Sequence, residues 1–165
     1  MRQCGECEVC CEIAEVKEDD FFKPAFQKCP HQCGGCAIYG KLQRPGICNA
    51  YQCSWLRGFG IEEDRPDKNS IMVSINRIDN FDFVTVIETE KNSAMTSGKD
   101  MIVDIVTKIN LPAIIFDCES SPPKTGDRLV IHKNIEHRCG GMMGDFIEKL
   151  NDEITMYKLV KTENN

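Results

Sequence analysis

Nine of the eleven cysteines in this 165-residue chain lie within its first 53 residues. They are Cys4, Cys7, Cys10, Cys11, Cys29, Cys33, Cys36, Cys48 and Cys53. Several neighbours along the chain are separated by two residues, a spacing that lets two thiolates of one tight turn bind the same ion. The sequence therefore predicts a metal-binding region whose ligands are these nine cysteines.

A disulfide framework is the main alternative, because small secreted domains are rich in cystine. The odd number of cysteines, the short spacings and the absence of an apolar leader segment argue against it. We therefore expect a reducing, cytoplasmic setting. Cys118 and Cys139 lie outside the cluster and are predicted to be inert thiols, as free cysteine often is in protein cores.

His31 lies between Cys29 and Cys33 in the stretch CPHQCGGC and is a tenth ligand candidate. The alternative is a turn residue that donates a hydrogen bond to a thiolate. His132 and His137 lie far from the cluster and are predicted to be surface or structural residues.

Cys10 and Cys11 are adjacent, which bears on the number of centres. Neighbouring side chains of an extended or turn backbone point apart, so both seldom serve one tetrahedral ion. The pair therefore predicts two nearby centres or one polynuclear cluster, and eight or nine thiolates divide naturally into two four-coordinate sites.

Zinc is the favoured cofactor, as two ions in a closed, redox-silent cage of cysteines. An iron–sulfur cluster is the alternative, because the CxxCxxC run resembles the first part of a ferredoxin pattern. It would indicate an electron-transfer or redox-sensing protein, although Glu12 rather than proline follows Cys11. A metal-dependent enzyme with one open metal position is the third hypothesis, so enzymatic activity stays uncertain.

The residues between the cysteines support a metal site. Pro45 is expected to fix the turn before Cys48, and Arg44 to offset the negative charge of the thiolates. Aromatic side chains often cover a small metal core that lacks apolar bulk. Tyr39, Tyr51 and Trp55 are the candidates for that role.

The stretch CGECEVCC, followed by CPHQCGGCAIYGKLQRPGICNAYQCSWL, resembles the CxxCxxCC cysteine-cluster family. This family is named as a zinc- or iron-chelating domain, and YkgJ-like proteins are members. The matching positions are Cys4, Cys7, Cys10 and Cys11; Cys29, Pro30 and His31; Cys36, Ile38 and Tyr39; Arg44, Pro45 and Cys48; and Tyr51 and Cys53. The resemblance implies eight principal cysteines, which are the nine above without Cys33.

Charge and hydropathy exclude two classes of partner. Residues 1–60 hold seven basic and seven acidic side chains, so the net charge of −6 lies in the rest of the chain. No basic stripe favours nucleic acid, and no apolar run of about 18 residues predicts a membrane span. Metal ions are therefore the expected partners.

The remainder of the chain predicts an α+β fold. Apolar and β-branched runs predict strands over 70–76, 83–89, 112–117 and 128–133, and 3.6-residue periodicity predicts helices over 98–110 and 144–154. Ser97 and Asp100 form a weak capping box for the first of these helices, and the stretch CGGMMG over 139–144 predicts a plain turn. We expect a small, irregular, metal-bound region over 1–60. It would lie on a mixed or antiparallel sheet with one or two helices over 61–165.

Overall fold

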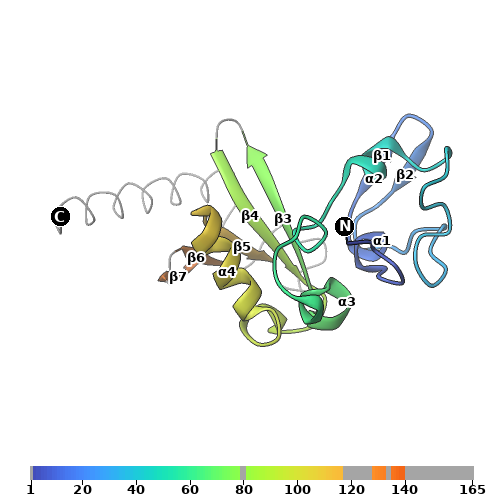
Figure 1. Ribbon diagram of the computed structural model, residues 1–165. Coiled ribbons are helices and arrows are strands. Elements are labelled where there is room, and N and C mark those ends of the chain that lie inside the picture. Colours follow the sequence, from blue (N-terminus) through green and yellow to red (C-terminus); the bar gives the residue numbers. More distant parts are fainter. Residues whose placement is uncertain (1, 79–80, 117–127, 133–134, 140–165) are drawn as a thin grey trace.

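The computed structural model describes residues 2–78, 81–116, 128–132 and 135–139 (Figure 1). Within the cysteine-rich region it has helix α1 (Val9–Ile13), strands β1 (Val16–Glu18) and β2 (Phe21–Lys23), and helix α2 (Gly46–Ala50). A short joint of η1 (Glu62–Asp64) and α3 (Pro66–Asn69) follows. The rest comprises β3 (Ile71–Ile78), β4 (Phe81–Glu88), η2 (Ser93–Met95), α4 (Lys99–Ile109), β5 (Ala113–Phe116), β6 (Arg128–His132) and β7 (Ile135–Cys139).

Five strands form one mixed sheet in the order β3-β4-β5-β6-β7. Strands β4 and β5 are parallel, because the chain crosses over through η2 and α4, and the other neighbours are antiparallel. The α+β prediction and the four predicted strands are confirmed. Strand β7 was not predicted, since its sequence IEHRC carries little apolar pattern. The predicted helix over 144–154 and Cys118 lie outside the described residues, as does most of the 139–144 turn.

Helix α4 covers one face of the sheet and closes the main core. Met101, Ile102, Ile105 and Val106 are buried at helical spacing against alternate residues of the strands, such as Val73 and Val86. The helix begins after Gly98, and Ser97 instead donates a hydrogen bond to the carbonyl of Asn69 (2.6 Å). The predicted capping box is therefore wrong, because a tertiary contact takes the serine hydroxyl.

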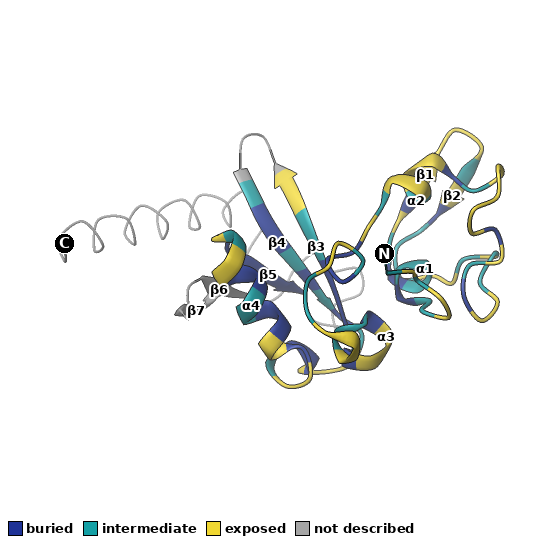
Figure 2. Ribbon diagram, in the orientation of Figure 1, coloured by how far each residue is buried: buried dark blue, intermediate teal, exposed yellow. Residues whose placement is uncertain are grey.

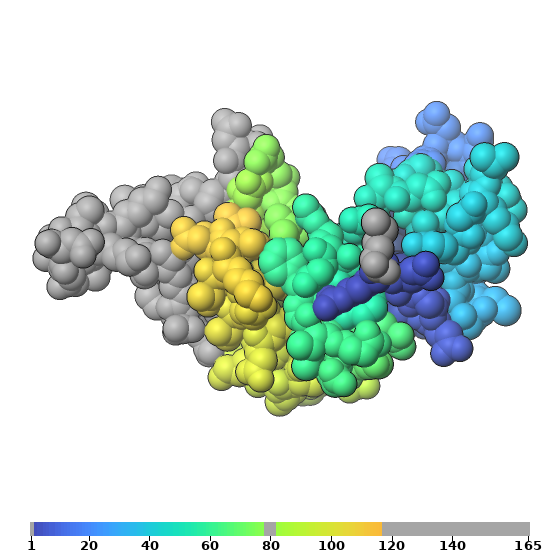
Figure 3. All heavy atoms as spheres, in the orientation of Figure 1, coloured from blue at the N-terminus to red at the C-terminus, as the bar shows by residue number. Residues whose placement is uncertain are grey.

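The cysteine-rich region contacts the opposite face of the same sheet. Val9 and Ile13 of α1 pack on Met72, whose side chain points away from α4 because neighbours along a strand alternate. The Tyr51 and Ser74 hydroxyls hydrogen-bond at 2.7 Å. Residues 2–50 thus form a lobe beside the sheet (Figure 3).

This lobe buries few side chains of its own. Figure 2 shows it mostly exposed or half-buried, whereas β3, β4, β5 and α4 carry most of the buried core residues. The region was expected to be irregular. It also contains two short helices and a β1–β2 hairpin in which Val16 pairs with Lys23. No helix among the described residues has the length and apolar character needed to cross a membrane.

Candidate metal centres

Helix α1 carries Cys10 and Cys11, so the expectation of an extended or turn backbone at this pair is wrong. A helix turns its successive side chains by about 100°, so the two thiols still diverge, though less than in a strand. The Cys10 thiol hydrogen-bonds to Cys11. This contact, followed by burial, raises the pKa of Cys10, and the same contact lowers the pKa of Cys11 to about 7.

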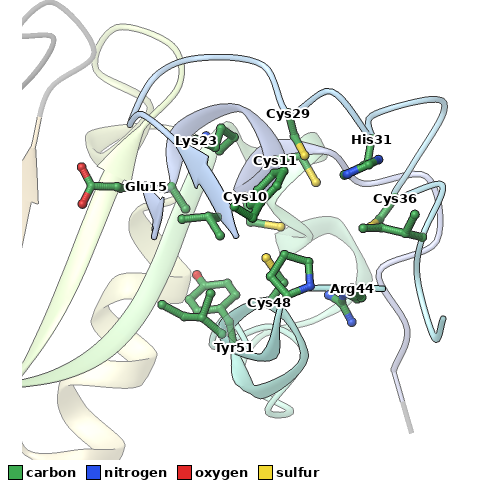
Figure 4. Close-up of a pocket in the computed structure, with 16 residues that line it drawn as sticks. Cys10, Cys11, Glu15, Lys23, Cys29, His31, Cys36, Arg44, Cys48 and Tyr51 are labelled. Carbon is green, nitrogen blue, oxygen red and sulfur yellow. The ribbon is translucent and has the colours of Figure 1, made fainter. Parts of the chain in front are cut away.

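A cavity of about 200 Å³ lies between α1, the hairpin and α2. Figure 4 shows thiols and other polar groups directed into it from these elements and from the segment between β2 and α2. Its lining includes Cys10, Cys11, Cys29, Cys36, Cys48, His31, Lys23 and Arg44, with apolar walls from Val16, Phe21, Ile38, Pro45 and Ile47. His31 lines the same cavity and stacks on Phe21, with 5.7 Å between the ring centroids.

A second and much smaller cavity, of about 20 Å³, lies on the other side of Cys10, toward the sheet. Its lining includes Cys4, Cys7, Cys10 and Cys53, with Leu56, Pro66 and Met72 as apolar walls. Burial raises the pKa of Cys7 to about 11, and also raises the pKa of Cys4 and Cys53. Without a metal, these thiols are therefore protonated at neutral pH.

Eight of the nine cysteines line one or both of the two cavities. We call Cys11, Cys29, Cys36 and Cys48 the larger centre, and Cys4, Cys7, Cys10 and Cys53 the smaller centre. Cys10 lines both cavities, and we assign it to the smaller centre because it brings that centre to four cysteines. Cys33 is exposed and is not among the residues given for either lining.

All nine cysteines of the cluster are free thiols, which agrees with the rejection of a disulfide framework. No three His, Cys, Asp or Glu side chains among the described residues are close enough together to hold one ion. The division into two centres therefore depends on which cysteines share a cavity.

Two cations face the thiols, and sequence reasoning found only one of them. Lys23 is 2% exposed, and its Nζ donates to the carbonyls of Pro24 (3.0 Å) and Gln27 (2.8 Å). Burial lowers the pKa of Lys23, whereas the nearby thiols, Cys29 first, act to raise it. The period-2 alternation of β2, which turns Lys23 inward, was the available signal, but a strand of three residues is too short to reveal it.

Arg44 lines both cavities, in the position that the sequence suggested for charge compensation. Burial raises the pKa of Cys4 and of Cys48, and the guanidinium of Arg44 opposes that increase at both thiols. The guanidinium lies 4.4 Å from the Tyr39 ring centroid, and its Nε is buried without a hydrogen-bond partner. A thiolate of either centre would provide the missing acceptor.

Two glutamates that the sequence did not single out hold the loops that carry the ligands. Glu8 accepts hydrogen bonds from the backbone N–H of Gly35 (2.7 Å) and from Gln32 Nε2 (2.7 Å). Gly35 has φ +116° and lies so close to Gly5 that an added Cβ would be 2.6 Å from the Gly5 oxygen. Only glycine fits at this position. The loop between Cys33 and Cys36 is thus tied to α1.

Glu18 holds α2 and with it Cys48. Pro45 precedes this helix and has no side-chain hydrogen bond to cap it. Glu18, at the end of β1, accepts from the N–H groups of Gly46 (2.9 Å) and Ile47 instead. The carboxylate satisfies two of the backbone donors that a helix leaves free at its start.

The three aromatic candidates have different roles. Tyr51 lines both cavities, as a covering residue would. Trp55 is buried in the main core of the sheet, where its Nε1 donates to the Ile61 carbonyl (2.8 Å). Tyr39 is 48% exposed beneath Arg44. The expectation that Trp55 covers the metal core is therefore wrong, because the sheet provides a larger apolar surface for it.

Replacement of Arg44 by glutamine should weaken metal binding at both centres. The change removes the cation that lines both cavities, and a hydrogen bond to a charged group contributes about 1.5–3 kcal/mol. We expect the affinity for each ion to fall by at least about tenfold in a competition titration with a chelator. Arg57→Gln, at an exposed arginine, is the control. An unchanged affinity in Arg44→Gln would show that Arg44 does not compensate the thiolates.

Comparison of the chain with family models, with curated proteins and with solved structures gave no match. The resemblance of its cysteine pattern to the CxxCxxCC family therefore stays a prediction. The case for function depends on the arrangement of the thiols described above.

Proposed function

We propose that this chain is a metal-binding protein that holds two ions, with zinc favoured, in two four-cysteine centres. The observation that carries the proposal is that eight cysteines line two cavities, which have only Cys10 in common among their cysteines. It agrees with the two-centre prediction from the adjacent cysteines.

The donor set of each centre fits zinc. Four thiolates are a common ligand set of structural, tetrahedral zinc, and each such site carries a formal charge of −2. Lys23 and Arg44 lie where they would partly neutralise that charge. Zinc would supply a cross-link without redox chemistry, and the protein residues would hold it, orient the loops and limit the entry of water.

An iron–sulfur cluster at the larger centre is the second candidate, and the cavity volume favours it. About 200 Å³ is tenfold the volume of the smaller cavity and exceeds what a single ion occupies. The apolar walls would shield such a cluster from water, which is one way in which proteins set its reduction potential. Among the described residues, no observation favours the metal-dependent enzyme over these two candidates.

Metal analysis of protein purified without oxygen tests the proposal. We expect two zinc ions per chain and a colourless protein, with a loss of binding when the cysteines are alkylated. Visible absorption together with acid-labile sulfide would instead support the iron–sulfur candidate. A fully reduced chain that binds no transition metal would contradict both.

A further inference from the structure

We propose that the two centres differ in how readily they exchange their metal ions. The larger centre gives up its metal to anionic thiol or chelating ligands that enter the cavity, and the smaller centre retains its metal. This inference rests on the proposed function and assigns a separate role to each centre: a transferable ion in one and a structural cross-link in the other.

Space for an incoming ligand exists at only one of the two centres. A water-sized sphere needs about 10–15 Å³ of cavity volume. The smaller cavity, at about 20 Å³, has room for one ion-sized occupant, whereas the larger, at about 200 Å³, has room for an ion and an additional ligand. Because zinc can expand to five ligands in a transition state, ligand exchange needs that additional room.

The smaller centre is anchored to the main core. Cys53 is 8% exposed and belongs to the same buried cluster as the sheet residues Ile71 and Val73. Arg2 ties the N-terminal segment, which carries Cys4 and Cys7, to the loop that follows Cys53. Its guanidinium donates to the carbonyls of Trp55 (2.8 Å), Phe59 (2.7 Å) and Gly60 (2.7 Å). Loss of an ion from this centre would require the N-terminal segment, or the segment around Cys53, to separate from the sheet.

Of the four cysteines of the larger centre, Cys11 lies on helix α1, which packs on the sheet, and the other three lack such an anchor. Cys29 and Cys36 lie in the segment between β2 and α2, which has no helix or strand beyond an isolated bridge. Helix α2, which carries Cys48, buries none of its residues. The contact of Glu18 with this helix is exposed to solvent. Opening of this centre therefore breaks surface contacts and leaves the core intact.

Charge also favours entry at the larger centre. Lys23 and Arg44 both line its cavity, whereas only Arg44 is among the residues given for the smaller one. Because a four-thiolate zinc centre carries a formal charge of −2, this pair of cations weakens the repulsion that an anionic thiolate or carboxylate ligand meets on entry. In the exchange, each metal–sulfur bond that breaks is replaced by a bond from the incoming donor. The cysteine takes up a proton or stays a thiolate, and no electrons are transferred.

The test follows zinc release from the fully loaded, full-length chain into an excess of a chromophoric carboxylate chelator. We expect two phases of equal amplitude whose rates differ by at least about tenfold, a barrier difference of about 1.4 kcal/mol. Cys48→Ser should remove the fast phase, and Cys53→Ser should remove the slow one.

Two variants that keep every cysteine provide an independent assignment. Glu18→Ala should accelerate only the fast phase, by about fivefold, in line with the typical loss of a helix cap. Arg2→Ala should accelerate only the slow phase. Glu63→Ala and Arg57→Ala, at exposed residues of the same types, should change neither.

The outcomes separate this inference from the proposed function. Release of two ions at one common rate would overturn the inference and leave the proposed function intact. Persistence of the fast phase in Cys48→Ser, or equal acceleration of both phases by Glu18→Ala, would do the same. A wild-type chain that binds fewer than two ions would overturn the two-centre function itself, and this inference with it.

Discussion

Complete removal of metal should unfold residues 2–50 while the five-stranded sheet keeps its structure. This segment buries only five apolar side chains, Val9, Ile13, Val16, Ile38 and Pro45, which is too small a core to offset the chain entropy lost on folding. Structural zinc in small domains contributes roughly 10–16 kcal/mol of apparent binding free energy. The metal is therefore expected to be the main source of stability for this lobe.

Hydrogen exchange measured before and after chelation checks this expectation. Amides of α1, β1, β2 and α2 should lose protection, whereas those of β3, β4 and α4 should keep it, because the main core does not depend on the metal. Addition of zinc should restore the protection and serves as the control for irreversible damage. Unchanged exchange in the lobe after verified metal removal would show that the cage is not structural.

Cys10→Ser and Cys11→Ser should each reduce the metal content from two ions to one, and each should remove a different ion. Cys10 completes the smaller centre, and Cys11 belongs to the larger one. Serine is a poor substitute for a zinc-binding thiolate, because the hydroxyl does not ionise at neutral pH. Metal analysis of the purified variants measures the effect.

Double variants assign each ion to its centre. Cys10→Ser should cause no further loss when it is added to Cys53→Ser, whereas Cys11→Ser added to Cys53→Ser should remove the second ion. Cys33→Ser, at an exposed thiol, is the matched control and should keep both ions. If neither Cys10→Ser nor Cys11→Ser lowered the metal content of Cys53→Ser any further, the two residues would serve one centre.

Patterns that are local in the chain could be recognised without the structure. The alternation of β3 and β4 and the apolar stripe of α4 are repeated over enough residues to stand out. The cysteine cluster is equally evident, because nine thiols within 53 residues are far more than ordinary packing uses. Elements of three to five residues, such as β1, β2, α1 and α2, were missed because so short a segment cannot display a period.

The sequence by itself determined which residue types are available for metal binding. Through the adjacent Cys10 and Cys11 it also predicts two nearby centres or one polynuclear cluster. Only the tertiary structure decided which cysteines share a cavity, because Cys53 reaches Cys4 and Cys7 across nearly fifty residues of chain. It also decided that Lys23 turns inward and that Trp55 joins the sheet. These outcomes depend on which surfaces meet when α1 packs on Met72, and no spacing along the chain encodes that contact.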